Sequence, residues 1–468
     1  MPQTLPRLAP LSVLLLALPL GACGATRTGG ALATGANLVS HQLCSAVFVG
    51  GQDPETYYRE ALAPDLSFLE PLSRHHVDRA KGEVTASLAG VRSRAIYRGA
   101  EGCLVVQGPV KPPVVALPAP AAARLPPIAG PQVVAPINPA LAAAVDRAFV
   151  EPAKGPARLT KSVVIVHDGR IVAERYAPGV GVDTPQHGWS MTKSVTNALL
   201  GVLVRQGRIA MDAPAPVAAW ADPADPRHAI TPDSLLRMAS GLEFGQSLNQ
   251  NWKTAFDPTA QMVFATPDMA AMVDKAPASA RPGELWRYSN GNTLLLSRMI
   301  RDRTGGDAAG VLAFAHRELF DKLGMTGVTL EFDAAGTPIG ASHMWATARD
   351  WARFGMLYLN DGVVGGERIL PAGWTDYSAR LTPGSEQYGY GAGFWTNRGE
   401  LQGFARMRRG AMPADSYLAR GSLGQAVVIV PSARLVIVRT GLSRSPDEDM
   451  GGIARLTREA IAALGPGA

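Results

Sequence analysis

The sequence is poor in several features that mark common classes of protein. Only 3 of its 468 residues are cysteines, 18% are charged, and the net charge of +6 comes from basic residues scattered among Ala and Gly. It has no long Lys/Arg run and no stripe of aromatic and basic residues, so we expect no nucleic-acid partner. Cys44 and Cys103 have no His at the spacing of a metal ligand set, so they do not make a zinc site. We therefore expect neither a metal nor an organic cofactor.

The N-terminus has no apolar run long enough for a mature membrane span. Residues 11–20 are apolar but too few to cross a bilayer, and they end in Leu20-Gly21-Ala22-Cys23, which looks like a bacterial lipobox. We predict that residues 1–23 are a lipoprotein signal peptide with its lipid on Cys23. Gly24 after the cysteine favours the outer membrane, with the protein facing the periplasm. The alternatives are an ordinary signal peptide cut near Ala22, or a cysteine without such a role.

The two remaining cysteines bracket a small unit. In an exported chain Cys44 and Cys103 meet an oxidising compartment, which favours a disulfide between them. The alternative is a pair of buried thiols. We predict a small N-terminal domain over residues 40–106, with a helix at 54–62 and strands at 83–88 and 94–97.

The segments on either side of this unit have the composition of connections. Residues 24–39 are rich in Gly, Ala and Thr, which predicts a flexible tether to the membrane. Residues 107–139 are rich in Pro, Ala and Val and show no helical period, which predicts a semi-rigid linker.

The large domain is predicted over residues 140–468. Strand patterns occur near both of its ends, and one pair flanks Asp168-Gly169, a strong hairpin signal. The middle is mostly helical in pattern. Strands at both ends with helices between them predict an α+β fold: an antiparallel sheet flanked by helices, with an inserted helical subdomain and a cleft between the lobes. The expected terminal elements are helices at 138–149 and 452–464 and strands at 162–167, 170–176, 425–430 and 435–439.

Ser190 and Lys193 form the chain's Ser-x-x-Lys motif. On a helix, residues three apart share a face, and the dipoles of the first turn disfavour a protonated amine there. Burial would lower the lysine pKa further, so that a neutral lysine could take the serine proton. The alternative is a helix-capping serine with a solvated lysine, because such a motif also arises by chance.

Two later segments could complete this chemistry. Tyr288 and Asn290 lie two apart on a loop, from which both can point into one cleft; alternatively this is a turn that merely starts a helix. Gly421 and Ser422 lead into a strand. A glycine there lets a substrate lie against the strand edge, and the next backbone N–H can bind an oxyanion.

Taken in order, these three segments resemble the active-site motifs of class C beta-lactamases. The same set occurs in DD-peptidases, family VIII esterases and 6-aminohexanoate-oligomer hydrolases. The resemblance extends over residues 140–468 and is greatest to the 6-aminohexanoate-hydrolase-like branch. It implies a beta-lactamase/transpeptidase-like fold, and its supporting segments are residues 235–241, 348–356, 388–395 and 412–415.

The resemblance also implies a role for each motif residue. Ser190 would be the acylated nucleophile, Lys193 its base, and Tyr288 the proton relay to the leaving group. Asn290 would hold the substrate or Lys193. The backbone N–H groups of Ser190 and Ser422 would form the oxyanion hole.

One motif departs from the family pattern. Beta-lactamases place Lys-Thr-Gly where this chain has Ala419-Arg420-Gly421, and that lysine helps to hold a substrate carboxylate. Because side chains alternate along a strand, we expect Arg420 to point to the opposite face. We therefore expect an esterase or amidase acting on a small molecule. The alternatives are a beta-lactamase, a DD-peptidase acting on cell-wall peptides, or a non-catalytic binding protein.

Other candidates carry less chemistry. The chain contains no Gly-x-Ser-x-Gly elbow, so His187 is interpreted as a loop residue rather than the base of a Ser-His-Asp hydrolase. Trp189, Trp286 and Trp395 could line an apolar acyl pocket, or could be packing residues.

Overall fold

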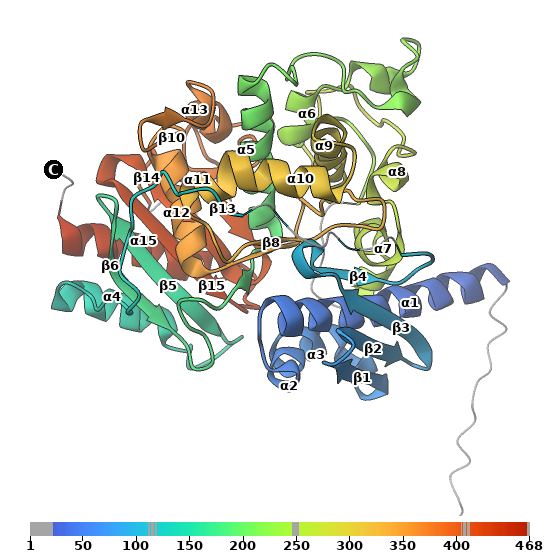
Figure 1. Ribbon diagram of the computed structural model, residues 1–468, viewed down its shortest axis with the longest axis horizontal. Helices are drawn as coiled ribbons and strands as arrows, with labels where there is room; N and C mark the ends of the chain where they lie inside the picture. The colour runs from blue at the N-terminus through green and yellow to red at the C-terminus, as the bar shows by residue number, and fades with distance from the viewer. Residues whose placement is uncertain are drawn as a thin grey trace, which may run out of the picture.

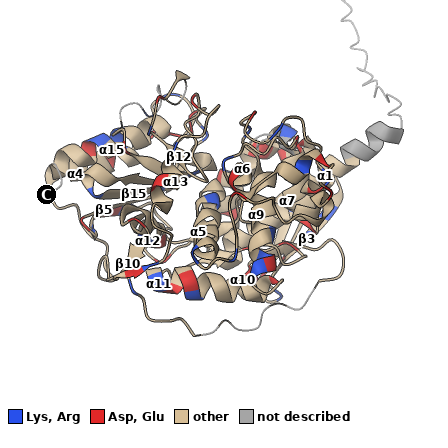
Figure 2. Ribbon diagram, turned by 90° about the horizontal axis from the view of Figure 1, so that it is seen from above, with Lys and Arg blue, Asp and Glu red and all other residues tan. Residues whose placement is uncertain are grey.

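The computed structural model describes residues 22–110, 113, 117, 119–245, 252–403, 405, 409 and 412–465. Residues 1–21, most of the predicted signal peptide, lie outside the described residues. Figure 1 shows a small N-terminal domain, in blue, lying along one side of a large domain. In Figure 2 the acidic and basic residues are interspersed over both domains.

The small domain consists of a long helix, a few short helical turns and a four-stranded sheet. The sheet is antiparallel, in the order β1-β2-β3-β4, and α1 packs against β2 and β3. Its elements are α1 (Ala22–Cys44), η1 (Ser45–Val49), α2 (Pro54–Tyr57), η2 (Tyr58–Leu62), α3 (Ala63–Leu66), η3 (Ser67–Leu72), β1 (Ser73–Asp78), β2 (Glu83–Leu88), β3 (Val91–Tyr97), η4 (Gly99–Glu101) and β4 (Cys103–Val105).

The prediction of a flexible tether over residues 24–39 was wrong, because these residues lie in α1. Its face toward the sheet is buried: Ala36 is 0% and Val39 1% exposed. Gly35 allows a close approach, since a Cβ there would lie 2.6 Å from Leu88. The small residues that suggested a linker therefore let the helix pack closely on the sheet. The small domain begins within α1 and not at residue 40.

A single helical segment in the described part of the chain is long and apolar enough to cross a membrane. It spans Gly29–Val49, and 67% of that window is buried inside the protein. The core helix of a globular domain meets the same criterion, and here the packing against the sheet accounts for the apolar residues.

The predicted disulfide is confirmed. Cys44 at the end of α1 is bonded to Cys103 at the start of β4, with 6.0 Å between the two Cα atoms. The described part of residues 106–138 contains no helix or strand. This linker is anchored on the large domain, because Leu125 and Ile128 are buried in its core.

The large domain contains the predicted sheet formed by both of its ends. Six antiparallel strands run in the order β12-β13-β14-β15-β5-β6, so that the first hairpin lies beside the last one. Helices α4 and α15 cover one face and α12 covers the other. The elements are α4 (Pro139–Phe149), β5 (Thr160–His167), β6 (Arg170–Tyr176), β12 (Trp395–Thr396), β13 (Tyr417–Gly421), η10 (Ser422–Gly424), β14 (Gln425–Val430), η11 (Pro431–Ala433), β15 (Leu435–Gly441) and α15 (Met450–Leu464).

Alternation along the strands builds two cores. Val164 and Val436 face the helical subdomain, whereas Ile165 and Ile437 face α4 and α15. Because both faces of the sheet are covered, the central strands β5, β14 and β15 are almost continuously buried and apolar.

The helical subdomain is inserted between β6 and β12. Its central helix, α5, is buried from residue 192 to residue 203 and packs against α9. The elements are β7 (Gln186–His187), η5 (Trp189–Met191), α5 (Thr192–Arg205), η6 (Ala218–Trp220), η7 (Pro226–Ala229), α6 (Pro232–Leu236), η8 (Trp252–Phe256), α7 (Pro258–Ala265), α8 (Met269–Val273), α9 (Asn290–Arg303), α10 (Ala308–Ala315), η9 (His316–Phe320), α11 (Asp321–Leu323), β8 (Thr329–Leu330), β9 (Met344–Ala346), α12 (Ala348–Leu359), β10 (Val363–Val364), β11 (Glu367–Arg368) and α13 (Trp374–Ala379).

Candidate active site

Ser190 and Lys193 lie at the start of the buried helix α5. Ser190 belongs to a 3₁₀ turn just before the helix, and Lys193 is in the first helical turn. Trp189 has a positive φ of 47°, an uncommon conformation for a residue with a large side chain. This sharp turn presents Ser190 to the cleft, with its Oγ 3.1 Å from Lys193 Nζ.

Lys193 is buried and surrounded by oxygen atoms. Its Nζ also donates to Asn290 Oδ1 and to the backbone carbonyl of Ala341, the latter at 2.8 Å. Burial lowers the pKa of Lys193 well below its ordinary value. A neutral amine has two hydrogens and one lone pair. In a neutral Lys193 the two hydrogens can be donated to the carbonyl oxygens of Asn290 and Ala341, and the lone pair is then available to the Ser190 hydroxyl, 3.1 Å away.

Tyr288 lies against the same pair of residues. Tyr288 and Ser190 both line the cleft, and Lys193 Nζ lies 4.8 Å from the centre of the Tyr288 ring. Packing against Tyr390, 5.6 Å between ring centres, holds the ring in place. Burial raises the pKa of Tyr288, so the hydroxyl is protonated at neutral pH.

Asn290 is the first residue of α9. The alternative that this segment simply starts a helix is therefore true, yet the Asn290 side chain also contacts Lys193. The N-termini of α5 and α9 meet at the amine. Because amide dipoles give each helix a positive N-terminus, both helices disfavour an ammonium there.

Gly421, at the end of β13, lies directly against the backbone of Gly188 and Ser190. A Cβ at this position would lie 2.2 Å from the carbonyl oxygen of Gly188 and 3.1 Å from the backbone N of Ser190. No side chain fits there. Ser422 follows in η10 and lines the cleft with Ser190.

The cleft has a volume of about 650 Å³. Trp286 stacks on Tyr388 with 4.9 Å between ring centres, and Trp395 packs against Tyr288. The tryptophans proposed for an acyl pocket thus line the cleft and pack at the same time. The lining residues are Trp189, Ser190, Leu285, Trp286, Arg287, Tyr288, Asn290, Ser342, Tyr388, Trp395, Arg420, Gly421, Ser422, Arg444, Ser445, Pro446 and Glu448.

The prediction that Arg420 points away from the cleft was wrong for its charged end. Strand alternation holds at its neighbours, since Leu418 and Ala419 belong to different cores. The long side chain nevertheless lines the cleft, donates to Glu448 at 2.6 Å and lies 5.3 Å from the Trp395 ring. Among the described residues, β12 pairs with β13 only at Tyr417 and Leu418, so the edge beside Arg420 has no strand partner there and the guanidinium can reach round it.

His187 is not a loop residue, which corrects the sequence interpretation. It lies in β7, is buried, and stacks on Trp345 with 4.9 Å between ring centres. Its Nε2 is 2.8 Å from the carbonyl oxygen of Ser342, and burial lowers its pKa to about 3. These contacts attach the segment that leads into Ser190 to β9.

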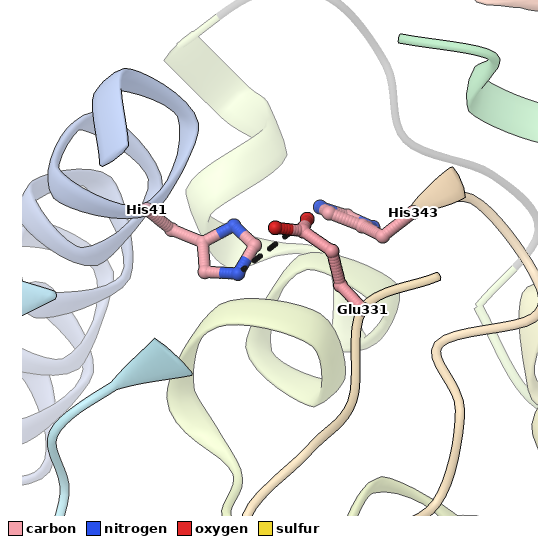
Figure 3. A group of neighbouring side chains, drawn as sticks. All are labelled: His41, Glu331 and His343. Atoms are coloured by element: carbon pink, nitrogen blue, oxygen red, sulfur yellow. Dashed lines mark ion pairs between the residues drawn. The ribbon is translucent and has the colours of Figure 1, made fainter. Parts of the chain in front are cut away.

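One group of buried side chains in the described part of the chain has the composition of a metal site. His41, Glu331 and His343 point toward one another, with ligand atoms within 4.8 Å of each other (Figure 3). Hydrogen bonds already engage most of these atoms. Ser45 and the backbone N of Cys103 donate to Glu331 Oε1, and both nitrogens of His343 have protein partners. The group joins α1 to the large domain.

Two parts of the site were not found in the sequence. The carbonyl of Ala341 is a backbone group and has no sequence signal. The loop at residues 442–449 supplies Arg444, Ser445, Pro446 and Glu448 to the cleft. Strand direction could have indicated this loop. Because β13 and β15 both pair antiparallel with β14, they run in the same direction and finish at the same end of the sheet.

Comparison with known proteins places this geometry among related chains. The model of the family described as Beta-lactamase matches residues 145–462. The chain is 25% identical to a 6-aminohexanoate-dimer hydrolase from Paenarthrobacter ureafaciens over 325 residues, 62% of this chain and 74% of the relative. A penicillin-binding protein homologue from Caulobacter crescentus is similar in fold, with a TM-score of 0.52 and 17% identity over 71% of this chain and 100% of that one. EstCE1, a hydrolase with promiscuous acyltransferase activity, is also similar in fold, with a TM-score of 0.51 and 15% identity over 68% of this chain and 97% of that one.

Proposed function

The chain belongs to the beta-lactamase family, and from this premise we propose that it is a serine hydrolase that cleaves a carboxylic ester or amide through an acyl-enzyme on Ser190. The observation that carries the proposal is the environment of Lys193. A buried amine with two carbonyl acceptors and a serine hydroxyl at 3.1 Å is arranged to act as a base.

The proposed reaction uses this arrangement in two stages. Lys193 Nζ takes the Ser190 proton as Oγ attacks the carbonyl carbon of the substrate. The backbone N–H groups of Ser190 and Ser422 are the proposed oxyanion donors, beside the positive end of α5. The proton then passes through the Tyr288 hydroxyl to the leaving oxygen or nitrogen. Water, deprotonated by the same groups, attacks the acyl carbon and releases the acid and Ser190.

The substrate is proposed to be an ester or an open-chain amide rather than a beta-lactam. The position of the family's carboxylate-holding lysine is Ala419, which is 1% exposed and belongs to the core. The cleft wall is instead aromatic and arginine-rich. One relative is named for hydrolysis of the 6-aminohexanoate dimer, an amide, which supports including amides among the substrates tested.

The test is hydrolysis of a small panel beside the Ser190→Ala variant. The panel is p-nitrophenyl acetate and butyrate, nitrocefin and the linear dimer of 6-aminohexanoate. We expect turnover of an ester or the amide, lost in Ser190→Ala, and covalent labelling of Ser190 by a fluorophosphonate. A protein that neither turns over any member nor is labelled would be a binding protein. Nitrocefin as the preferred member would make it a beta-lactamase.

We also propose that the chain is lipid-anchored through Cys23 at the outer membrane, facing the periplasm. The support is the sequence Leu20-Gly21-Ala22-Cys23 after an apolar run. Metabolic labelling with an alkyne-bearing palmitate analogue should mark the wild-type chain and not Cys23→Ser. Equal labelling of both chains, or of neither, would contradict the anchor.

A further inference from the structure

One wall of the cleft is formed by a loop whose anchor lies in the other domain. The loop at residues 442–449 connects β15 to α15 and supplies Arg444, Ser445, Pro446 and Glu448 to the cleft lining.

The small domain holds the start of this loop. The Arg444 guanidinium donates to the Asp65 carboxylate on α3 and, at 2.6 Å, to the carbonyl oxygen of Ala61. Both charged side chains are only 20% exposed, so the pair is largely shielded from water, where a charge-assisted hydrogen bond is strong. Leu442, two residues earlier, packs against the core of the small domain.

Further contacts attach the loop to the end of β13 and the residues just after it. The backbone N of Ser443 donates to the Leu423 carbonyl at 2.9 Å, and Glu448 accepts from Arg420 at 2.6 Å. The loop therefore spans from the small domain to the rim beside Ser422. In the sequence, Arg444 lies between Ser443 and Glu448, the two residues that attach the loop to this rim.

We infer that the small domain is part of the substrate-binding site, and that Asp65 is a positioning residue that holds Arg444 and the cleft wall against the substrate. This inference rests on the proposed function. Ser190 and Lys193 are held by α5, α9 and the Ala341 carbonyl. The Leu423 and Gly424 carbonyls also accept hydrogen bonds from Arg439 in the core of the large domain. Loosening the wall should therefore weaken substrate binding and leave the chemical step intact.

The experiment compares steady-state kinetics of the full chain and its variants on p-nitrophenyl butyrate and the 6-aminohexanoate dimer. Asp65→Asn keeps the side-chain size but removes the charge. We expect KM to rise about tenfold, equivalent to about 1.4 kcal/mol of binding, with kcat within about twofold. The matched control is Glu60→Gln, which removes the 2.6 Å ion pair between Glu60 and Lys161. This pair also joins the two domains, but neither of its residues lines the cleft. Its KM should be unchanged.

Arg444→Ala supplies an independent readout and serves alone if Asp65→Asn does not fold. It should raise KM similarly, and the double variant should raise it no further, because the two residues act through one contact. An unchanged KM in Asp65→Asn and Arg444→Ala would overturn the inference while wild-type turnover upheld the hydrolase. An equal KM rise in Glu60→Gln would also overturn it. Absence of wild-type turnover and of Ser190 labelling would overturn both.

Discussion

Replacing Asn290 by Asp tests directly whether the base is a neutral lysine. The change is isosteric and places a carboxylate in contact with the buried amine of Lys193, whose pKa is lowered by burial. Two unit charges about 4 Å apart attract by about 4 kcal/mol at an effective dielectric of about 20. Burial of the new carboxylate offsets part of this attraction. We expect the ammonium form to be favoured by roughly 10- to 1000-fold.

The consequence is a shifted pH profile. In the proposed mechanism the uncharged form of Lys193 is the base, so kcat/KM should decrease as the pH falls through the pKa of Lys193. A neighbouring carboxylate raises that pKa, which moves the acid limb of the profile upward by roughly one to three pH units. The assay is kcat/KM on p-nitrophenyl butyrate from pH 5 to 10, corrected for spontaneous hydrolysis.

Two variants control for other effects of the change. Asn290→Ala removes the hydrogen bond without adding charge and should not move the acid limb upward. Asn292→Asp adds a buried carboxylate to the same helix, but the Asn292 side chain is hydrogen-bonded to Ser240 and not to Lys193. This variant should therefore move the acid limb less than Asn290→Asp does. An Asn290→Asp profile with the wild-type acid limb, merely lower at every pH, would refute the assignment of Lys193 as the base.

Three further predictions concern packing and stability. Gly421→Ala should lower the free energy of unfolding by about 1–3 kcal/mol and the activity by at least about tenfold, because a Cβ there meets the backbone of Gly188 and Ser190. Urea titrations and ester assays measure the two effects. The control is Gly130→Ala, where a Cβ would have nothing within 4 Å and should change neither quantity. Replacing both Cys44 and Cys103 by Ala removes a disulfide that spans 59 residues, and should lower the free energy of unfolding in urea by roughly 4 kcal/mol. A variant with the same urea midpoint as the wild type would contradict this. Burial raises the pKa of Glu331 to about 7, above its unfolded value, so its contribution to stability is present at low pH and lost as the pH rises toward 7. Relative to Glu331→Gln, the wild type should lose up to about 3 kcal/mol between pH 4.5 and 7 in chemical unfolding, and parallel curves would refute it.

Much of the fold followed from local patterns in the sequence. The Asp168-Gly169 turn and the apolar strands around it specified the first hairpin, and the second hairpin was specified in the same way. These signals are local, because a tight turn and the alternation of side chains depend on a few neighbouring residues. The Ser-x-x-Lys spacing likewise placed Ser190 beside Lys193 at the start of one helix.

Other features depended on contacts that no short pattern contains. Residues 24–39 have a linker-like composition, but the neighbouring sheet buries Ala36 and Val39 and makes the segment a helix. Arg420 obeys strand alternation at its backbone, yet the edge of the sheet is open enough for its guanidinium to reach the cleft. Length and flexibility of the side chain outweigh its starting direction there.

The sequence by itself predicted the candidate nucleophile, base and relay, because the spacing of Ser190 and Lys193 suits a helix face and the three motifs resemble those of a known family. Only the tertiary structure decided what surrounds them. The Ala341 carbonyl that accepts from Lys193 lies 148 residues away, and Asp65 lies 379 residues from the Arg444 that it holds. Contacts over such separations form when apolar faces pack and bring distant segments together, and packing is a property of the whole chain.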